Sequence, residues 1–517
     1  MIPVDFKERM KGLLSETEYD EFIDSFEREE DRIRALRVNR TKCPDKTFSE
    51  ISVPWEETGY YYDSAVPFGK HPYHEAGLYY IQEASAMAPV HFLDVKPGDR
   101  VLDLCAAPGG KSTQIGAALK GEGLLVSNEI NRDRAKILSL NIERMGITNA
   151  LVLSEDSAHL SEVFEGYFDK ILVDAPCSGE GMFRKNENAS DEWSIENVKM
   201  CAERQSEILD NAAKMLAPGG RLVYSTCTFS PEENEENIYG FLLRHVDFHT
   251  EETELIGGME HGRISWISVR DNTTHYTSLV DSLGNDDRSS IVTTDEPGKC
   301  SDAAINEVSN SVRLWPNRVK GEGHVLCVLK RDGSSDTDAS KSYVPGGRNV
   351  KAKKEVIKIF EEFAGDVFIQ NNAEQYDIDI KDDSMTLNLA SGLRVEGIFL
   401  SFGDQLYLAP KDMPSIVGLK VLRPGLHLGT VKKDRFEPSH ALALVLSPAD
   451  VNFTVDFPSD SPEIDRYLNG ESIRSIEGID KNTKGWCLVT TDSYSIGWGK
   501  YAGGMLKNHY PKGLRIQ

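Results

Sequence analysis

The chain has 517 residues and a formal net charge of -25, with 39% hydrophobic and 27% charged residues. This length exceeds what one hydrophobic core supports, so we expect about three or four domains. The hydrophobic content is ordinary and no apolar run approaches about 18 residues, which excludes an integral membrane protein. The charged N-terminus lacks the apolar segment of a signal peptide, so we expect a cytoplasmic protein.

The cysteine pattern argues against disulfides and against metal. Eight cysteines are present, without a Cys-x-x-Cys pair or a Cys/His cluster at zinc spacing. We therefore expect free thiols and no structural metal. The negative net charge by itself argues against a nucleic-acid partner, because phosphate contacts supply much of that affinity. Local basic segments can reverse this conclusion.

The N-terminal elements are predicted to be helical, and an alternating pattern follows them. Residues 16–37 read as a helix, and the apolar segment 78–93 reads as a second one. From residue 100 onward, short apolar runs alternate with helical segments. The predicted strands are 100–104, 123–129, 150–155, 168–175 and 219–226. This alternation is typical of a doubly wound α/β fold, in which helices cover both faces of a parallel sheet.

The second half of the chain is predicted to contain an insertion, a linker and two further modules. Residues 271–310 are rich in Ser, Thr, Asp and Asn without periodicity, which predicts a flexible, exposed insertion. Residues 313–331 supply one more strand of the sheet. The predicted parts of the chain are an N-terminal extension (1–95), the α/β core (96–331), a linker (332–350), an α+β accessory domain (351–447) and a second α+β module (448–517).

A glycine turn after the first core strand is a candidate cofactor loop. It lies in DLCAAPGGKSTQIGAAL (103–119), where Gly109 and Gly110 let a ligand approach the backbone at the start of a helix. Glu129 ends the second strand and can bind two ribose hydroxyls, and Asp156 follows the third and can accept from an adenine amine. The dinucleotide and P-loop glycine patterns are both absent. This set favours S-adenosylmethionine.

Two cysteines follow predicted core strands, in DAPCSG (Cys177) and YSTCTF (Cys227). Because the carboxyl ends of parallel strands meet at one edge of the sheet, we expect both thiols beside the cofactor. A thiolate that adds to C6 of cytosine makes C5 able to accept a methyl group, and a second thiol can serve the elimination that follows. Asp174 can hydrogen-bond the N3/N4 edge of a flipped cytosine, and Lys111 can supply the positive field that favours a thiolate.

Each of these residues also has a purely structural interpretation. Asp174 could cap a following helix, and a cysteine is among the most frequently buried residue types. We prefer the structural interpretation for Cys105, Cys201, Cys327 and Cys487.

Four long motifs in order resemble those of the Sun-family RNA (cytosine-5) methyltransferases. They are YIQEAS, LDLCAAPGGK, DAPCSGEGMFRK and YSTCTFSPEENE, within residues 78–331. The resemblance implies a Rossmann-like, seven-stranded core that depends on S-adenosylmethionine. It makes Cys227 the nucleophile and gives Cys177 a role in product release, and the presence of both cysteine motifs points to RNA rather than DNA. Asn317 departs from the family pattern, where we expect His.

The resemblance also carries over a set of cofactor contacts. They are Cys105, Ala106, Ala107, Pro108, Gly109, Gly110, Lys111, Glu129, Arg134, Asp156 and Asp174.

The C-terminal half resembles the modules appended to the bacterial F-type 16S ribosomal RNA methyltransferases, and its end resembles their PUA-like RNA-binding part. Residues 496–517 contain no acidic residue. Their basic residues are Lys500, Lys507, Lys512 and Arg515, and their large aromatic residues are Trp498, Tyr501 and Tyr510. Basic groups among aromatics predict phosphate contacts and base stacking. The alternative is that the aromatics form the core of a small β-domain. A second basic strip, residues 32–42, predicts RNA binding by the N-terminal extension.

These observations predict a monomeric, S-adenosylmethionine-dependent RNA (cytosine-5) methyltransferase. Its expected substrate is 16S ribosomal RNA, free or in the small ribosomal subunit. One alternative is a transfer-RNA cytosine-5 methyltransferase with the same chemistry. The other is a non-catalytic ribosome-assembly factor that keeps the fold, against which the intact Cys177, Cys227, Asp174 and Lys111 argue.

Overall fold

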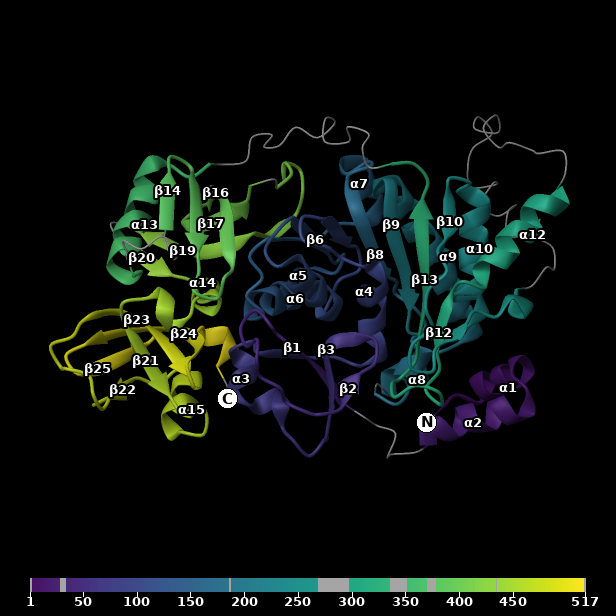
Figure 1. The fold of residues 1–517 in the computed structure, drawn as a ribbon, viewed down its shortest axis with the longest axis horizontal. Coiled ribbons are helices and arrows are strands. Elements are labelled where there is room, and N and C mark those ends of the chain that lie inside the picture. Colours follow the sequence, from purple (N-terminus) through teal and green to yellow (C-terminus); the bar gives the residue numbers. More distant parts are fainter. Residues whose placement is uncertain are drawn as a thin grey trace. The chain divides into compact units, whose positions relative to one another are not determined.

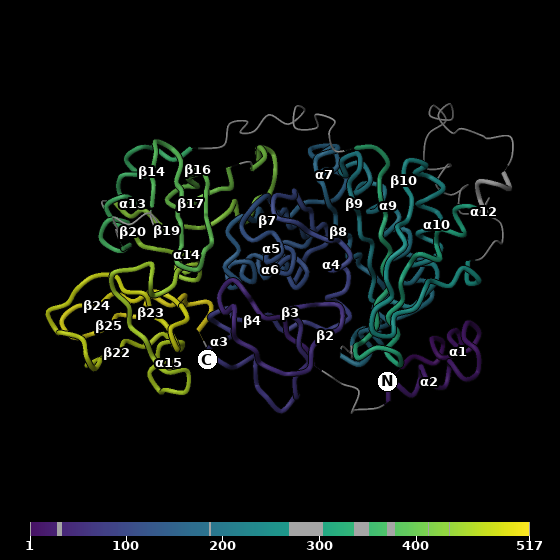
Figure 2. The backbone as a smooth tube through the Cα atoms, viewed as in Figure 1, coloured from purple at the N-terminus to yellow at the C-terminus, as the bar shows by residue number. Residues whose placement is uncertain are grey.

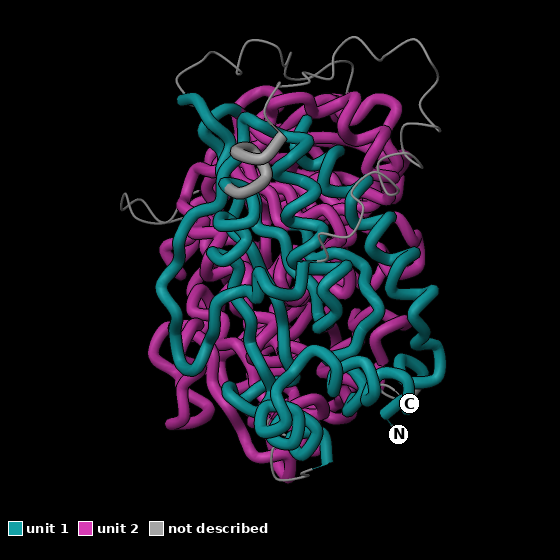
Figure 3. Tube along the Cα trace, turned by 90° about the vertical axis from the view of Figure 1, so that its right-hand side faces the viewer, with its two compact units in different colours: residues 1–32, 173–214, 218–334 teal, residues 33–172, 215–217, 335–517 magenta. Residues whose placement is uncertain are grey.

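The computed structural model describes residues 2–27, 34–185, 187–267, 297–334, 351–369, 378–411, 413–433 and 435–515. The chain divides into two compact units (Figure 3). Unit 1 contains residues 1–32, 173–214 and 218–334, and unit 2 contains residues 33–172, 215–217 and 335–517. Within the described ranges, no helix is long and apolar enough to cross a membrane.

Unit 2 begins with an antiparallel sheet in the order β2-β3-β1-β4. Its strands are β1 (Arg34–Val38), β2 (Ser52–Val53), β3 (Glu56–Tyr62) and β4 (Tyr79–Ile81). The short helices α3 (Pro72–Glu75) and α4 (Ala88–Leu93) lie before and after β4 in the chain.

Two of the predicted helices are therefore partly wrong. The first ends at Glu27, since the next described residues form β1, and the segment 78–93 begins as β4 before it becomes helical at η3 (Ser85–Met87) and α4. Leu36 pairs with Ile81 and Val38 with Tyr79, so each segment is a strand because of a partner distant in sequence. Buried strands of this kind lack the alternation that would distinguish them from a helix.

The second sheet of unit 2 contains the predicted parallel strands, in the order β8-β5-β6-β7. They are β5 (Arg100–Asp103), β6 (Leu124–Asn128), β7 (Ala150–Leu153) and β8 (Phe168–Asp174), whose last two residues begin unit 1. The helices α5 (Gly110–Leu119), α6 (Arg132–Arg144) and α7 (Ser157–Val163) alternate with them. The expected α/β fold is thus confirmed. An unexpected strand, β18 (Val421–Pro424), pairs antiparallel with β7.

Unit 1 contains a sheet in the order β11-β12-β13-β9, with β10 also paired to β13. Its strands are β9 (Leu216–Thr226), β10 (Phe248–Thr250), β11 (Glu260–His261), β12 (Val312–Leu314) and β13 (His324–Arg331). The helices α8 (Glu187–Glu192) and α9 (Ile195–Met215) precede β9 in the chain, and α10 (Glu235–Arg244) lies between β9 and β10 (Figure 1). The strand pairs β11·β12, β12·β13, β13·β9 and β10·β13 are all antiparallel.

The N-terminal helices α1 (Val4–Leu13) and α2 (Glu16–Glu27) pack in unit 1 through aromatic side chains. The ring centroid of Phe6 lies 5.1 Å from that of Phe183, and the ring of Phe22 lies 5.1 Å from Phe229. Phe229 is the last residue of YSTCTF, two positions after Cys227, so these helices pack against the loop that carries Cys227.

The predicted irregular insertion, residues 271–310, is helical in its C-terminal part. Residues 297–308 form the helix α12 (Pro297–Val308), in which Ala304 and Val308 are buried. The part of the prediction that covers residues 271–296 lies outside the described residues, as does residues 335–350 of the predicted linker.

The C-terminal half of unit 2 consists of two further α+β elements (Figure 2). The first joins α13 (Lys354–Val367) and α14 (His440–Val445) to an antiparallel sheet. Its strands are β14 (Ile378–Lys381), β15 (Ser384–Asn388), β16 (Arg394–Phe402), β17 (Gln405–Pro410), β19 (Leu426–Lys432) and β20 (Arg435–Pro438). The second joins α15 (Pro462–Leu468) to the strands β21 (Thr454–Phe457), β22 (Ile473–Arg474), β23 (Gly485–Thr491), β24 (Tyr494–Ala502) and β25 (Met505–Asn508).

Candidate active site

The glycine loop of unit 2 joins β5 to α5 and is hydrogen-bonded to residues of β6 and α6. The Ala106 amide donates to the carbonyl of Asn128 at 2.8 Å, and Arg134 and Asn141 donate to the carbonyls of Ala107 and Pro108 at 2.9 and 2.8 Å. The two bonds from α6 occupy the carbonyls of Ala107 and Pro108.

The two glycines of the loop are required by geometry. Gly109 has φ +115°, a conformation that side chains disfavour, and a Cβ there would lie 3.1 Å from Leu138 Cδ1. A Cβ at Gly110 would lie 3.3 Å from Tyr80 Cε1. The two glycines thus shape the turn that begins α5, the position at which a cofactor loop binds its ligand.

An arginine that the sequence argument assigned to RNA supports this loop instead. Arg37, 1% exposed, donates to the carbonyl of Gly110 at 3.0 Å, to Thr113 Oγ1 at 2.8 Å and to Gln82 Oε1 at 3.2 Å. Lys42, in the same strip, donates to the carbonyls of Ala76 and Arg144.

The predicted basic strip 32–42 is consequently not a surface for phosphates at these two positions. Burial lowers the pKa of Lys42 to about 7, so its charge is only partial near neutrality. Arg32 lies outside the described residues.

The predicted acidic cofactor residues follow neighbouring parallel strands of unit 2. Glu129, 4% exposed, comes directly after β6; it accepts from the Asn131 amide at 2.9 Å and lies 3.4 Å from Arg134. Asp156 is exposed after β7 and accepts from the His159 amide, a hydrogen bond that holds its pKa below the usual value. Lys111 is buried on the first turn of α5. The structure thus keeps these carboxylates at the strand ends that follow the loop.

In unit 1 the two cysteine motifs come together. The sulfur atoms of Cys177 and Cys227 lie 3.2 Å apart, within reach of a thiol hydrogen bond. That hydrogen bond and then burial raise the pKa of Cys177 well above the usual value. The neighbouring sulfur and burial therefore favour the thiol form of Cys177.

Asp174 lies at the end of β8, where no helix follows for it to cap. Its Oδ1 accepts from Ser225 Oγ at 2.8 Å and lies 3.4 Å from Nε2 of His324, which is 3% exposed. His324 was not predicted from the sequence. Its only signal was a histidine at the start of the last core strand, which nothing in the motifs singled out.

A close backbone approach fixes the loop of Cys227. The Gly181 amide donates to the Cys227 carbonyl at 2.8 Å, and a Cβ on Gly181 would lie 3.1 Å from that oxygen. Glu180, fully buried, accepts from the Phe229 amide at 2.7 Å and from Trp193 Nε1 at 3.0 Å. The segment after DAPCSG is thereby bonded to the segment after YSTC.

The remaining cysteines agree with their structural interpretation, except at the cofactor loop. Cys201, Cys327 and Cys487 are buried, and burial raises the pKa of Cys201 to about 11 and that of Cys487 to about 12. Cys105 is only partly buried and belongs to the glycine loop.

At the C-terminus the prediction about aromatic side chains is wrong. Trp498, Tyr501 and Tyr510 are 1%, 1% and 2% exposed, so they cannot stack on bases, and Trp498 Nε1 donates to the carbonyl of Ser439 at 2.8 Å. The basic residues remain accessible: Lys500, Lys507 and Lys512 are exposed and Arg515 is partly exposed. Lys500 Nζ lies 5.3 Å from the ring centroid of Trp486, which is only partly buried.

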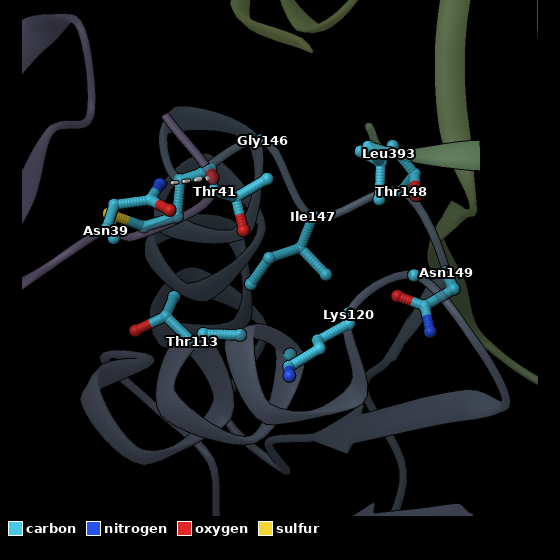
Figure 4. Close-up of a pocket in the computed structure, with 13 residues that line it drawn as sticks. Asn39, Thr41, Thr113, Lys120, Gly146, Ile147, Thr148, Asn149 and Leu393 are labelled. Atoms are coloured by element: carbon cyan, nitrogen blue, oxygen red, sulfur yellow. Dashed lines mark hydrogen bonds between the residues drawn. The ribbon is translucent and has the colours of Figure 1, made fainter. Parts of the chain in front are cut away.

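A pocket beside α5 is too small to hold a substrate (Figure 4). Asn39, Thr113, Lys120 and Asn149 are among the residues that line it. Its cavity volume of about 20 Å³ has room for about one water molecule, which needs roughly 10–15 Å³ on this measure. It is therefore no candidate for the reaction.

Family models match four successive parts of the chain. The N-terminal domain of 16S rRNA methyltransferase RsmF matches residues 2–84, and 16S rRNA methyltransferase RsmB/F matches residues 90–276. The RsmF rRNA methyltransferase first C-terminal domain matches residues 385–446, and the methyltransferase RsmF PUA domain matches residues 454–516.

Whole-chain relatives agree with these matches. The protein "Ribosomal RNA small subunit methyltransferase F" of Vibrio vulnificus (strain YJ016) is 30% identical over 99% of this chain and 97% of its own length. The protein of the same name from Aeromonas salmonicida (strain A449) is 30% identical over 96% and 93%. A crystal structure titled PH0851 has a TM-score of 0.50 and 26% identity, covering 64% of this chain and 66% of its own. The resemblance seen in the motifs is confirmed, and the chain belongs to the RsmB/F family of 16S rRNA methyltransferases.

Proposed function

We propose that this methyltransferase forms 5-methylcytosine in 16S ribosomal RNA, with Cys227 as the nucleophile and S-adenosylmethionine as the methyl donor. The observation that carries the proposal is the 3.2 Å separation of Cys177 and Cys227. Cytosine C5 is a poor nucleophile, so its methylation needs one group to add at C6 and another to help remove the C5 proton. Two adjacent thiols supply both.

The residues of unit 2 suit the proposed cofactor. The glycine turn of loop 105–111 allows a close backbone approach at the start of α5, and Glu129 and Asp156 offer carboxylate acceptors for ribose hydroxyls and an adenine amine. Arg134 would keep the loop and Glu129 in place, since it contacts both. When bound, S-adenosylmethionine supplies an electrophilic methyl group on its sulfonium.

The proposed reaction uses the side chains of unit 1 in sequence. Addition of the Cys227 thiolate forms an S–C6 bond and shifts the π electrons toward C5, which takes the methyl group. Once Cys177 has released its own proton to solvent, its thiolate takes the C5 proton; the electron pair of that C–H bond restores the C5=C6 bond, and the S–C6 bond breaks to release Cys227 as a thiolate. Asp174 would bind the N3/N4 edge of the base, held by Ser225 and His324.

The C-terminal module is the proposed RNA-binding part, through Lys500, Lys507, Lys512 and Arg515. Its support is the match to an RsmF PUA domain and the accessibility of these basic groups. We also propose that the chain acts as a monomer in the cytoplasm, where ribosomal RNA is assembled. The boundaries 1–95, 96–331, 351–447 and 448–517 remain our proposal for its domains.

Bisulfite sequencing of 16S ribosomal RNA and transfer RNA tests the function. RNA from a strain without the gene is compared with RNA from the same strain carrying the wild type or Cys227→Ala. A protected cytosine in 16S RNA that only the wild type restores is the expected result. A change confined to transfer RNA contradicts the substrate, and no change in either RNA contradicts the enzymatic proposal.

A further inference from the structure

We propose that Glu233 is a positioning residue for the two-cysteine chemistry: it fixes the turn that carries Cys177 and keeps Cys177 in its thiol form while Cys227 acts as the nucleophile. The inference deepens the proposed function and rests on it for the roles of the two cysteines. Glu233 belongs to the SPEENE segment (230–235) that follows YSTCTF.

Glu233 ends the short helix η5 (Pro231–Glu233) and is fully buried. Its Oε2 accepts from the Ser178 amide at 2.9 Å and from Gln205 Nε2 at 2.8 Å, and its Oε1 accepts from Ser178 Oγ. Gln205 Nε2 also donates to the carbonyl of Pro176 at 3.0 Å. Both neighbours of Cys177 in the chain are therefore held by Glu233 or by its partner.

The same carboxylate reaches the second cysteine through one further hydroxyl. Ser178 Oγ lies 2.8 Å from Thr228 Oγ1, so the residues that follow the two cysteines are hydrogen-bonded to each other. Because Ser178 gives its hydroxyl proton to Glu233, Thr228 must be the donor in this contact. Glu233 thus fixes the position of one sulfur relative to the other.

The charge of Glu233 also affects the protonation of Cys177. The titratable groups that face it are Glu180 on η4 (Glu180–Met182), Tyr224 on β9, Cys201 on α9 and Cys177 itself. A negative carboxylate beside Cys177 disfavours a thiolate there. A neutral Cys177 thiol can donate a hydrogen bond to the sulfur of Cys227, and this bond stabilises a thiolate at the attacking position.

Alkylation kinetics of single thiols test this inference without RNA or cofactor. In a Cys227→Ser background, the rate of Cys177 alkylation by iodoacetamide is followed by peptide mass spectrometry from pH 6 to pH 11. Glu233→Gln removes the charge, and we expect Cys177 to react about tenfold faster near pH 8, because its pKa falls without the negative neighbour. Glu232→Gln, which changes a neighbouring carboxylate bound to Arg9, is the matched control.

The midpoint of the titration separates this role from a purely structural one. Loosening of the loop would raise the rate at every pH and leave the midpoint unchanged, which would overturn the proposal. If Glu233→Gln does not fold, the Cys227→Ser protein alone still decides: a Cys177 midpoint at or below about 8.5, the value of a free thiol, also overturns it. Failure of methyl transfer in the wild type would instead contradict the proposed function and leave this thiol measurement valid.

Discussion

Arg37 of strand β1 donates a hydrogen bond to the carbonyl oxygen of Gly110, the first residue of helix α5, at 3.0 Å. A side chain from the N-terminal sheet of unit 2 thus stabilises the proposed cofactor loop. Arg37 is buried and also binds Thr113 and Gln82, so its removal would leave three polar groups without this donor.

We therefore expect Arg37→Met to weaken cofactor binding and stability together. An unsatisfied buried polar group costs about 1–3 kcal/mol, so the free energy of unfolding should fall by at least that amount. Calorimetric titration with S-adenosylmethionine and urea unfolding are the measurements. Arg40→Met is the control, since Arg40 donates to the carbonyls of Pro44 and Lys46 and to the Tyr60 hydroxyl, away from the loop. Equal effects of the two substitutions would show that Arg37 has no special relation to the loop.

Substitution of the two cysteines should block the methylation reaction at different steps. Cys227→Ala should abolish methyl transfer and leave no covalent complex, because no thiolate adds to C6. Cys177→Ala should trap the protein on RNA, because the S–C6 bond cannot be released. Denaturing gels with labelled 16S RNA distinguish the outcomes. Normal turnover by Cys177→Ala would contradict its release role.

Glu233 should make stability depend on pH. Burial and then the charge of Glu180 raise its pKa from 4.5 to about 7. Between these values the unfolded chain releases the proton while the folded chain retains it, so the stabilising effect is complete below pH 4.5 and is lost as the pH rises through 7. Relative to Glu233→Gln, the wild type should lose roughly 3 kcal/mol over this interval. Urea unfolding at several pH values measures it, and parallel curves for the two proteins would contradict the assignment.

The ion pair between Arg313 and Glu235 should respond to single and double changes differently. Both side chains are almost fully buried, and Nε and Nη2 of Arg313 lie 2.7 and 2.5 Å from the two carboxylate oxygens. Arg313→Met leaves a buried carboxylate without its partner, which should cost about 3–5 kcal/mol. Adding Glu235→Leu should recover part of that loss. A double variant less stable than either single one would show that the pair is not an isolated unit.

RNA affinity should depend on the exposed lysines of the C-terminal module. Replacement of Lys500, Lys507 and Lys512 by Gln should make the negative slope of log affinity against log salt less steep by about two, if each lysine contacts one phosphate of a single strand. Filter binding to 16S RNA at several salt concentrations measures this slope, and cofactor affinity serves as the control. An unchanged slope would place the RNA contacts elsewhere.

Substitution is a sharper test here than truncation from Val451 onward. Trp498 belongs to a hydrophobic core that also contains Phe363 of α13, and their ring centroids lie 6.2 Å apart. Removal of the module would expose this core. A loss of RNA binding would then be confounded with a loss of stability.

Much of the fold and the chemistry could be predicted from local patterns. Apolar runs separated by helical segments identified β5 to β9, because strands buried on both faces must be continuously apolar. The glycine loop, Cys177 and Cys227 were predicted because their residue types are needed for a close ligand approach and for nucleophilic attack, whatever the surrounding structure.

The rest depended on partners that are distant in sequence. Strands β1 and β4 exist because they pair with each other, and β18 exists because it pairs with β7. Contacts with residues distant in sequence also place Arg37 at the proposed cofactor loop and not on an RNA-binding surface, and they bury Trp498 in a hydrophobic core. His324 and Glu233 reach Asp174 and Ser178 only in the folded chain. The sequence alone therefore determined which chemical groups the protein uses, and tertiary packing decided which other residues hold them, because burial and pairing are properties of contacts that no local pattern contains.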